Sequence, residues 1–350
     1  MLIHTLADLG WSAPFLQQLD IEELENLAPM RVSAVHRDRL EALGLEGPAS
    51  LRLAGAEETG DYAVGDWLLV APESQRVMRR LERASELARR AAGTDARRQL
   101  LAANVDVMFI TSSCNADFNA RRLERYLALA EQAAITPVLV LTKADTCESL
   151  DAREDWQAQG EALMPGLAVL LLDARAPDQV SALTDWWRKG QTAVLLGSSG
   201  VGKSTLANAL CGDMQATGGI REDDAKGRHT TTSRSFLQAR HGGWLIDTPG
   251  LRALRLQDAG EGIDAVFSDV AEMAERCRFS DCQHESEPGC AVQAAIAEGT
   301  LEADRLRRWQ KLRSEDRRNS ETIAQSRHRE KQFGKIVREA MRERDRRGKS

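Results

Sequence analysis

The residues best suited to chemistry are the glycines, lysine and serine of GSSGVGKST, residues 197–205. They fit the pattern Gly-x-x-x-x-Gly-Lys-Ser, in which glycines let backbone N–H groups wrap phosphates and a following helix N-terminus adds positive charge. In this pattern Lys203 reaches the β- and γ-phosphates and Ser204 ligates Mg²⁺. The pattern alone does not choose between ATP and GTP. The nucleotide-binding residues that it predicts are Gly197, Ser198, Ser199, Gly200, Val201, Gly202, Lys203, Ser204 and Thr205.

Two later motifs have the composition of segments that respond to a γ-phosphate. In WLIDTPG, residues 244–250, Asp247 ends a predicted strand and could support Mg²⁺, while Gly250 could offer its N–H to the γ-phosphate. Between this motif and the phosphate loop lies GRHTTTSR, residues 227–234, with three threonines. We expect one of them, assigned to Thr231, to contact Mg²⁺; a plain solvent-exposed loop is the alternative.

The stretch LTKAD, residues 141–145, has the form of a guanine-reading loop after a short apolar strand. The Asp145 carboxylate can accept hydrogen bonds from guanine N1–H and N2–H₂, a donor pair that adenine lacks. By analogy with base readout, such a two-bond contact is worth about 1–3 kcal/mol. Thr142 and Ala144 complete the loop, and the stem of Lys143 would pack over the purine.

A further predicted strand, Val169–Leu172, is followed by Asp173 and Ala174, where a backbone N–H could contact guanine O6. The order along the chain is therefore the guanine loop, a second base loop at Asp173 and Ala174, the phosphate loop, and then the two segments that respond to a γ-phosphate, here called the first and second switch. A permuted order is structurally tolerable because the termini of compact domains often lie close together. It also leads the second switch directly into the C-terminal part of the chain.

A cluster of three cysteines and one histidine lies further on, with the spacing Cys-x4-Cys-x-His-x5-Cys. Three thiols and one imidazole make a complete tetrahedral set for Zn²⁺, which favours a structural over a catalytic site. Disulfides are the competing account, but nothing in the sequence indicates an oxidising compartment. The predicted zinc ligands are Cys277, Cys282, His284 and Cys290.

The elements that must position these motifs form an α/β pattern from residue 105 onward. Apolar strands are predicted at 105–111, 138–141, 169–172, 193–196 and 244–246, with helical patterns between them. Such alternation indicates a mostly parallel sheet covered on both faces. Residues 31–70 instead show short strands separated by turns, which suggests a small β-barrel. Residues 75–100, rich in Arg and Ala, read as a connector, and the chain beyond residue 262 reads as helical.

Composition is that of a soluble globular protein of more than one domain, with 350 residues, 42% hydrophobic and 29% charged. No signal peptide or membrane-spanning run is visible, so a cytoplasmic protein without membrane partners is expected. The net charge is −6, yet residues 301–350 hold 17 Lys or Arg against 9 Asp or Glu. This basic tail indicates either an anionic partner such as RNA or a solvated helical face.

Taken together, the motifs resemble those of circularly permuted GTPases that depend on the small ribosomal subunit, the RsgA (YjeQ) family. The resemblance covers most of the chain beyond residue 100, and VGDWLLV, residues 64–70, is similar to part of that family's N-terminal OB-type barrel. The other resembling stretches are AANVD (102–106), LTKAD (141–145), GSSGVGKST (197–205), GRHTTT (227–232), DTPG (247–250) and CRFSDCQHESEPGC (277–290).

The resemblance implies an RNA-binding OB domain, a circularly permuted P-loop GTPase domain and a helical zinc-binding domain. It implies that the protein binds GTP, GDP and the 16S rRNA of the 30S subunit, and hydrolyses GTP with stimulation by that subunit late in its maturation. The expected divisions are 1–30, an N-terminal extension; 31–96, the OB-like domain; 97–260, the GTPase domain; and 261–350, the zinc domain with its tail. A monomer is expected.

The chain departs from the common GTPase pattern at two positions. Thr142 stands where many GTPases have Asn, which predicts the loss of one polar contact to the base or to the phosphate loop. Leu251 stands where Ras-like proteins have a water-orienting Gln, which leaves His229 or a group of the ribosome to activate water. Two other functions stay open: a nucleotide-gated rRNA-binding module with negligible hydrolysis, and a P-loop ATPase or kinase.

Overall fold

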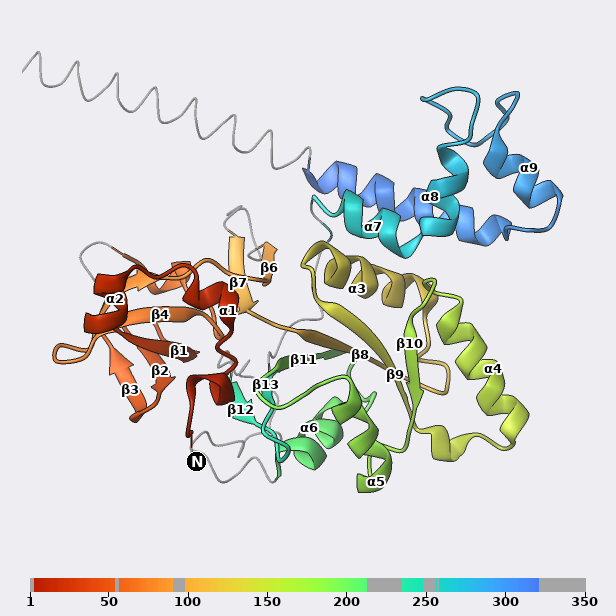
Figure 1. Cartoon of the computed structure of the whole chain (residues 1–350). Helices are drawn as coiled ribbons and strands as arrows, with labels where there is room; N and C mark the ends of the chain where they lie inside the picture. Colours follow the sequence, from red (N-terminus) through yellow and green to blue (C-terminus); the bar gives the residue numbers. More distant parts are fainter. Residues whose placement is uncertain are drawn as a thin grey trace, which may run out of the picture.

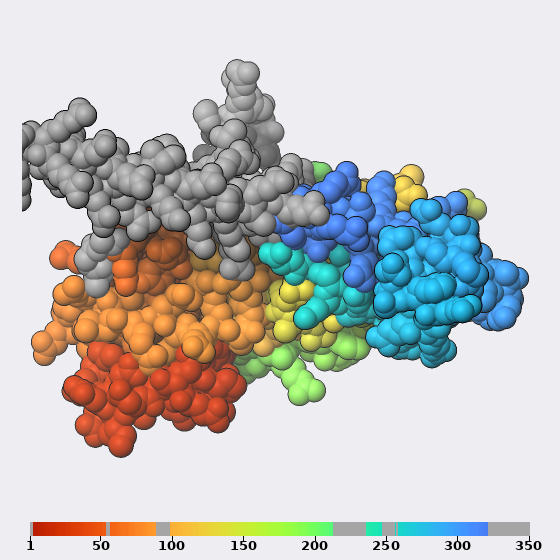
Figure 2. All heavy atoms as spheres, turned by 90° about the horizontal axis from the view of Figure 1, so that it is seen from above, coloured from red at the N-terminus to blue at the C-terminus, as the bar shows by residue number. Residues whose placement is uncertain are grey.

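The computed structural model describes residues 3–53, 57–90, 98–212, 235–247, 256 and 258–320. The chain runs from a β-rich N-terminal part through a central α/β part to C-terminal helices (Figure 1). In the space-filling view the N-terminal strands and the C-terminal helices occupy opposite ends, with the α/β part between them (Figure 2). No described helix is both long enough and apolar enough to cross a bilayer.

The N-terminal part begins with short helical turns and continues into an antiparallel sheet of order β3-β2-β1-β4-β5. The elements are η1 (Leu6–Leu9), α1 (Ala13–Leu16), α2 (Ile21–Asn26), β1 (Ala28–Val35), β2 (Leu40–Gly44), β3 (Gly47–Leu51), η2 (Thr59–Asp61), β4 (Trp67–Ala71) and β5 (Arg76–Arg80). One isolated bridge, Arg52 to Arg76, joins the two edges of the sheet. A single bridge does not make a closed barrel, so the barrel stays a prediction.

The prediction of a connector over residues 75–100 is wrong, because this segment supplies β5, β6 (Glu86–Arg90) and the start of β7 (Arg98–Ala103). The last two pair as an antiparallel hairpin. Most of the arginines that suggested a connector belong to strands, and in β5 Val77 is buried while Arg76 and Arg80 are exposed. The composition led to a wrong prediction because a strand with one solvent-exposed face can carry long charged side chains on that face.

The central sheet has the order β10-β9-β8-β11-β13-β12 and is parallel except for the edge strand β12. The five predicted strands are all present, and only β12, which pairs antiparallel with β13, was not foreseen. The strands are β8 (Val107–Ser113), β9 (Thr136–Thr142), β10 (Ala168–Leu171), β11 (Thr192–Gly197), β12 (Ser235–Gln238) and β13 (Trp244–Asp247).

Helices cover both faces of this sheet, as the unbroken apolar character of its strands requires. Successive residues of a strand point to opposite faces. Thus Phe109 of β8 packs in one cluster with Leu206, while Ile110 packs in another with Leu127. The helical elements are α3 (Ala120–Gln132), η3 (Ala144–Thr146), α4 (Leu150–Glu161), α5 (Pro177–Val180), η4 (Ser181–Asp185) and α6 (Lys203–Cys211).

The N-terminal part is fastened to the central sheet at the β12–β13 hairpin. Trp244 Nε1 donates a hydrogen bond of 2.6 Å to the backbone oxygen of Asp8, whose carboxylate lies 2.7 Å from Lys189 Nζ. The buried Arg31 guanidinium lies 4.9 Å from the centre of the Phe236 ring and donates to the Asn104 carbonyl. Asn104 belongs to the AANVD stretch, which therefore forms part of the joint between the two regions.

The C-terminal helices are α7 (Gly260–Val266), α8 (Ser268–Ala274), α9 (Ala291–Ala297) and a helical segment over residues 303–320. Of these, α7 packs on α3 of the central part (Figure 1), and the segment over residues 303–320 contacts α3 through Arg305 and Arg308. Contact is close because Gly262 has no side chain: a Cβ there would lie 2.2 Å from the Ala128 carbonyl oxygen.

Candidate functional site

The phosphate loop connects the carboxyl end of β11 to the first turn of α6, as the sequence predicts. A Cβ at Gly197 would lie 2.1 Å from the Thr111 carbonyl oxygen of the neighbouring strand, so only glycine fits there. Gly200 and Gly202 have φ of 80° and 93°, values that other residues rarely adopt. Ser199, Ser204 and Thr205 are exposed on the loop and first turn, and the Lys203 ammonium donates to the Ser198 carbonyl within the loop.

The predicted guanine loop leaves the carboxyl end of β9 through an unusual backbone turn. Lys143 adopts the left-handed conformation, with φ 59° and ψ 30°, and leads directly into η3. A residue with a side chain rarely adopts this conformation, and such residues cluster at functional sites. The turn leaves Ala144 buried and Asp145 exposed at the surface.

The three predicted nucleotide loops meet at Gly202. A Cβ placed there would lie 3.6 Å from Ala174 Cβ and 3.7 Å from Thr142 Cγ2. The carboxyl ends of parallel strands are where α/β folds bind ligands. Loops that are far apart in the sequence, with the guanine loop coming first, are therefore brought into one place.

Thr142 makes a polar contact with the phosphate loop. Its buried hydroxyl lies 2.7 Å from the Val201 carbonyl oxygen and 3.0 Å from that of Ser112. The sequence-based expectation that replacing Asn by Thr could forgo the contact to the phosphate loop is therefore wrong. Val201 and Ser112 contribute through their backbones, which no side-chain motif reveals.

Asp173 does not stand alone beside Ala174, because an arginine links it to the guanine loop. Arg175 Nη2 lies 2.7 Å from Asp145 Oδ2, and its Nε lies 3.1 Å from Asp173 Oδ1. The hydrogen bonds from Arg175 hold the pKa of the Asp173 carboxyl below its usual value. Sequence reasoning missed Arg175, although it directly follows Asp173 and Ala174 in the chain.

The predicted switch residues are described only in part. Asp247 is the last residue of β13, which lies beside the phosphate-loop strand β11 in the sheet. Its position agrees with a strand end near the phosphate loop, and its role stays a prediction. His229, Thr231 and Gly250 lie outside the described residues.

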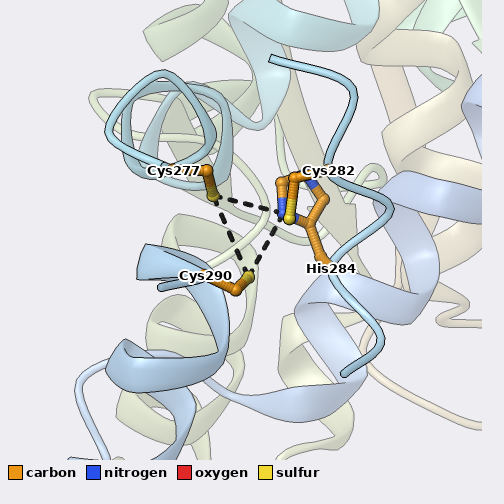
Figure 3. A group of neighbouring side chains, drawn as sticks. All are labelled: Cys277, Cys282, His284 and Cys290. Atoms are coloured by element: carbon orange, nitrogen blue, oxygen red, sulfur yellow. Dashed lines mark hydrogen bonds between the residues drawn. The ribbon is translucent and has the colours of Figure 1, made fainter. Parts of the chain in front are cut away.

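The four predicted zinc ligands point toward one another (Figure 3), and their ligand atoms all lie within 4.8 Å of one another. Cys277 Sγ lies 3.9 Å from Cys290 Sγ, and these two sulfurs lie 3.6 and 3.5 Å from His284 Nδ1. Tetrahedral zinc with ordinary bond lengths places sulfurs about 3.8 Å apart and sulfur and nitrogen about 3.6 Å apart. The residues therefore fit Zn²⁺, and the cysteines are free thiols rather than disulfides.

The local backbone and burial also suit metal binding. Cys290 is the N-cap of α9, Cys277 follows α8, and His284 is held in the left-handed conformation with φ 60°. Burial lowers the pKa of His284, which favours the neutral imidazole that metals require. Burial raises the pKa of Cys282 to about 11, and a bound cation would favour the thiolate form of this residue.

The helical part that carries the Cys/His cluster is joined to the central part by a buried ionic network. Glu124 of α3 is fully buried, and its Oε1 lies 3.1 Å from Arg305 Nη1 and 2.8 Å from Arg308 Nε. Arg305 also pairs with Asp269 of α8. Breaking such a buried pair by removing one partner costs about 3–5 kcal/mol, so the two parts are firmly coupled.

Comparison with known proteins gives concordant matches. Residues 80–257 match the model of the RsgA GTPase family. The chain is 54% identical over 320 residues to "Small ribosomal subunit biogenesis GTPase RsgA" of Mesorhizobium japonicum, covering 90% of this chain and 91% of that one. It is 48% identical over 336 residues to "Small ribosomal subunit biogenesis GTPase RsgA 2" of Vibrio vulnificus, covering 96% and 95%.

Solved structures share the fold at low sequence identity. YjeQ from Thermotoga maritima superposes with a TM-score of 0.61 at 22% identity, covering 82% of this chain and 97% of that one. YloQ, described as a circularly permuted GTPase, superposes with a TM-score of 0.59 at 23% identity, covering 83% and 94%. These likenesses agree with a permuted order of loops around the central sheet.

Proposed function

Because the chain belongs to the RsgA GTPase family, we propose that it hydrolyses GTP to GDP and phosphate during biogenesis of the small ribosomal subunit. The observation that carries the proposal is the meeting of three loops at Gly202, which brings together the phosphate loop, Thr142 of the guanine loop and Ala174. One loop suits phosphates and another suits guanine, so their contact supports a guanine nucleotide as the ligand.

Within this site each residue has a distinct role. The phosphate-loop N–H groups and the Lys203 ammonium bind the phosphates, and Asp145 selects guanine over adenine. Ser204, at the exposed start of α6, would hold Mg²⁺ together with Asp247 and Thr231. When bound, the metal neutralises phosphate charge. His229 is proposed as a group that orients water, and Gly250 as the γ-phosphate contact.

The remaining parts of the chain are proposed to bind the 16S rRNA of the 30S subunit. Exposed Arg76 and Arg80 on β5 and the basic C-terminal tail supply positive charge for phosphate contacts. The four-residue Cys/His cluster is proposed to hold one structural Zn²⁺. We propose a monomeric cytoplasmic protein whose domains are those expected at 1–30, 31–96, 97–260 and 261–350.

Phosphate release measured with and without purified 30S subunits tests this function. We expect the subunits to stimulate hydrolysis of GTP but not of ATP, and Lys203→Ala to abolish the stimulated rate. Failure of the subunits to stimulate the wild-type protein would leave a nucleotide-gated binding module instead. Equal use of ATP would favour a P-loop ATPase.

A further inference from the structure

Arg175 lies between two carboxylates on different loops of the predicted base site. Its Nη2 lies 2.7 Å from Asp145 Oδ2 and 3.2 Å from Asp173 Oδ2, and its Nε lies 3.1 Å from Asp173 Oδ1. The side chain of Arg175 is 70% exposed. The guanidinium thus bridges the loop after β9 to the loop after β10 at the molecular surface.

The Asp173 end of this bridge is fixed by the backbone. Asp173 Oδ1 accepts a 2.9 Å hydrogen bond from the Arg175 N–H, and the Asp173 N–H donates to Gln179 Oε1 at 2.8 Å. The next residue, Ala174, is buried near Gly202 of the phosphate loop. Arg175 therefore anchors the Asp145 side chain to a loop that is itself packed on the phosphate loop.

The bridge leaves Asp145 able to accept hydrogen bonds from a base. In the described structure Arg175 contacts only Oδ2 of Asp145. Each carboxylate oxygen has two acceptor sites, so Oδ1 and one site on Oδ2 stay available for two further donors. Guanine offers two donors at the edge facing such a carboxylate, whereas hypoxanthine, which lacks the 2-amino group, offers one.

We propose that Arg175 is a positioning residue that sets guanine specificity, by orienting the Asp145 carboxylate so that both of its oxygens face the base. The inference rests on the proposed guanine-reading role of Asp145. Arg175 contacts Asp173 through two nitrogens while one of them also reaches Asp145. The single ammonium nitrogen of a lysine cannot reproduce this fixed planar arrangement. Loss of the bridge therefore weakens the binding of a base with two donors more than the binding of a base with one.

Equilibrium dissociation constants for GDP and IDP, measured by titration calorimetry, test the proposal without involving hydrolysis. For Arg175→Ala we expect GDP to bind about two- to fivefold more weakly, the range of an exposed ion pair, and IDP to change less. The preference for GDP over IDP therefore falls. Arg175→Lys does not restore it, and Arg188→Ala, at another exposed arginine of the same domain, leaves it at the wild-type value.

Two results would overturn the proposal. An unchanged preference in Arg175→Ala would reduce the bridge to a surface ion pair, and tighter GDP binding would make Arg175 a competitor of the base. Titration of Asp145→Asn with GDP and XDP separates a failure of the Arg175 inference from a failure of the guanine-reading role of Asp145. If that variant shifts to XDP while Arg175→Ala behaves as wild type, only the Arg175 inference fails; if it keeps its preference for GDP, the guanine assignment fails too.

Discussion

Replacing Thr142 with valine removes one hydroxyl and preserves the shape of the side chain. That hydroxyl is fully buried and lies within hydrogen-bonding distance of Val201 in the phosphate loop and Ser112 in β8. A hydroxyl has one proton, so it donates to one of these carbonyls at a time, and the 2.7 Å contact with Val201 is the shorter. The substitution therefore tests the link between the guanine loop and the phosphate loop.

The expected magnitude follows from the burial of the contact. A hydrogen bond in a folded protein contributes about 0.5–1.5 kcal/mol net, and leaving a buried acceptor unpaired costs about 1–3 kcal/mol. We take the lower part of this range and expect unfolding to become easier by about 1–2 kcal/mol. If about 1 kcal/mol of this lost stabilisation also weakens GDP binding, the GDP dissociation constant rises about fivefold.

Chemical denaturation and GDP titration of the same samples provide the measurement. Thr184→Val is the matched control, because the Thr184 hydroxyl also donates at 2.7 Å to a backbone carbonyl, that of Ser181, but at the surface outside the site. The control should change neither quantity by more than about 0.5 kcal/mol. Wild-type GDP affinity in a destabilised Thr142→Val protein would refute the link between the two loops.

Three further predictions concern the parts around the site. Protein purified without chelator should contain about one zinc per chain, and Cys282→Ser should lower both the zinc content and the melting temperature; less than half an equivalent in the wild type would count against the metal site. Gly262→Ala should destabilise by about 1–3 kcal/mol because its Cβ would meet the Ala128 carbonyl, whereas Gly260→Ala, which meets nothing within 4 Å, should not. A hydrogen bond from Lys189, and to a smaller extent one from the N–H of Thr5, lowers the pKa of Asp8 from 3.8 to about 2. The wild type should therefore lose this stabilisation as pH falls from about 4 toward 2, and Asp8→Asn should lack that part of the pH dependence in denaturation midpoints.

Regular patterns in the sequence were sufficient to predict five strands of the central sheet. The apolar runs of β8, β9, β11 and β13 are buried on both faces and that of β10 is partly buried, so their sequences carry a strong strand signal. The phosphate loop and the Cys/His cluster were also predictable, because each requires particular residues at fixed spacing. The structure brings the four cluster residues together as expected.

Other contacts could not be read from residue types because they depend on tertiary approach. Nothing about Gly262 distinguishes it from a helix-weakening glycine until α3 lies against α7. Glu124 resembles a solvated helix residue, yet Arg305 and Arg308, far along the chain, bury it. Arg175 was likewise invisible, since its two carboxylate partners come from separate loops that only the folded sheet brings together.

We propose that the loop bearing Asp145 reads guanine although it precedes the phosphate loop in the chain. The most direct measurement is subunit-stimulated phosphate release by Asp145→Asn with GTP and with XTP as substrates. An amide there offers a donor to the 2-oxo group of xanthine and loses an acceptor for guanine, so the variant should hydrolyse XTP faster than GTP. A variant that still prefers GTP, with its fold and zinc content unchanged, would show that Asp145 does not read guanine.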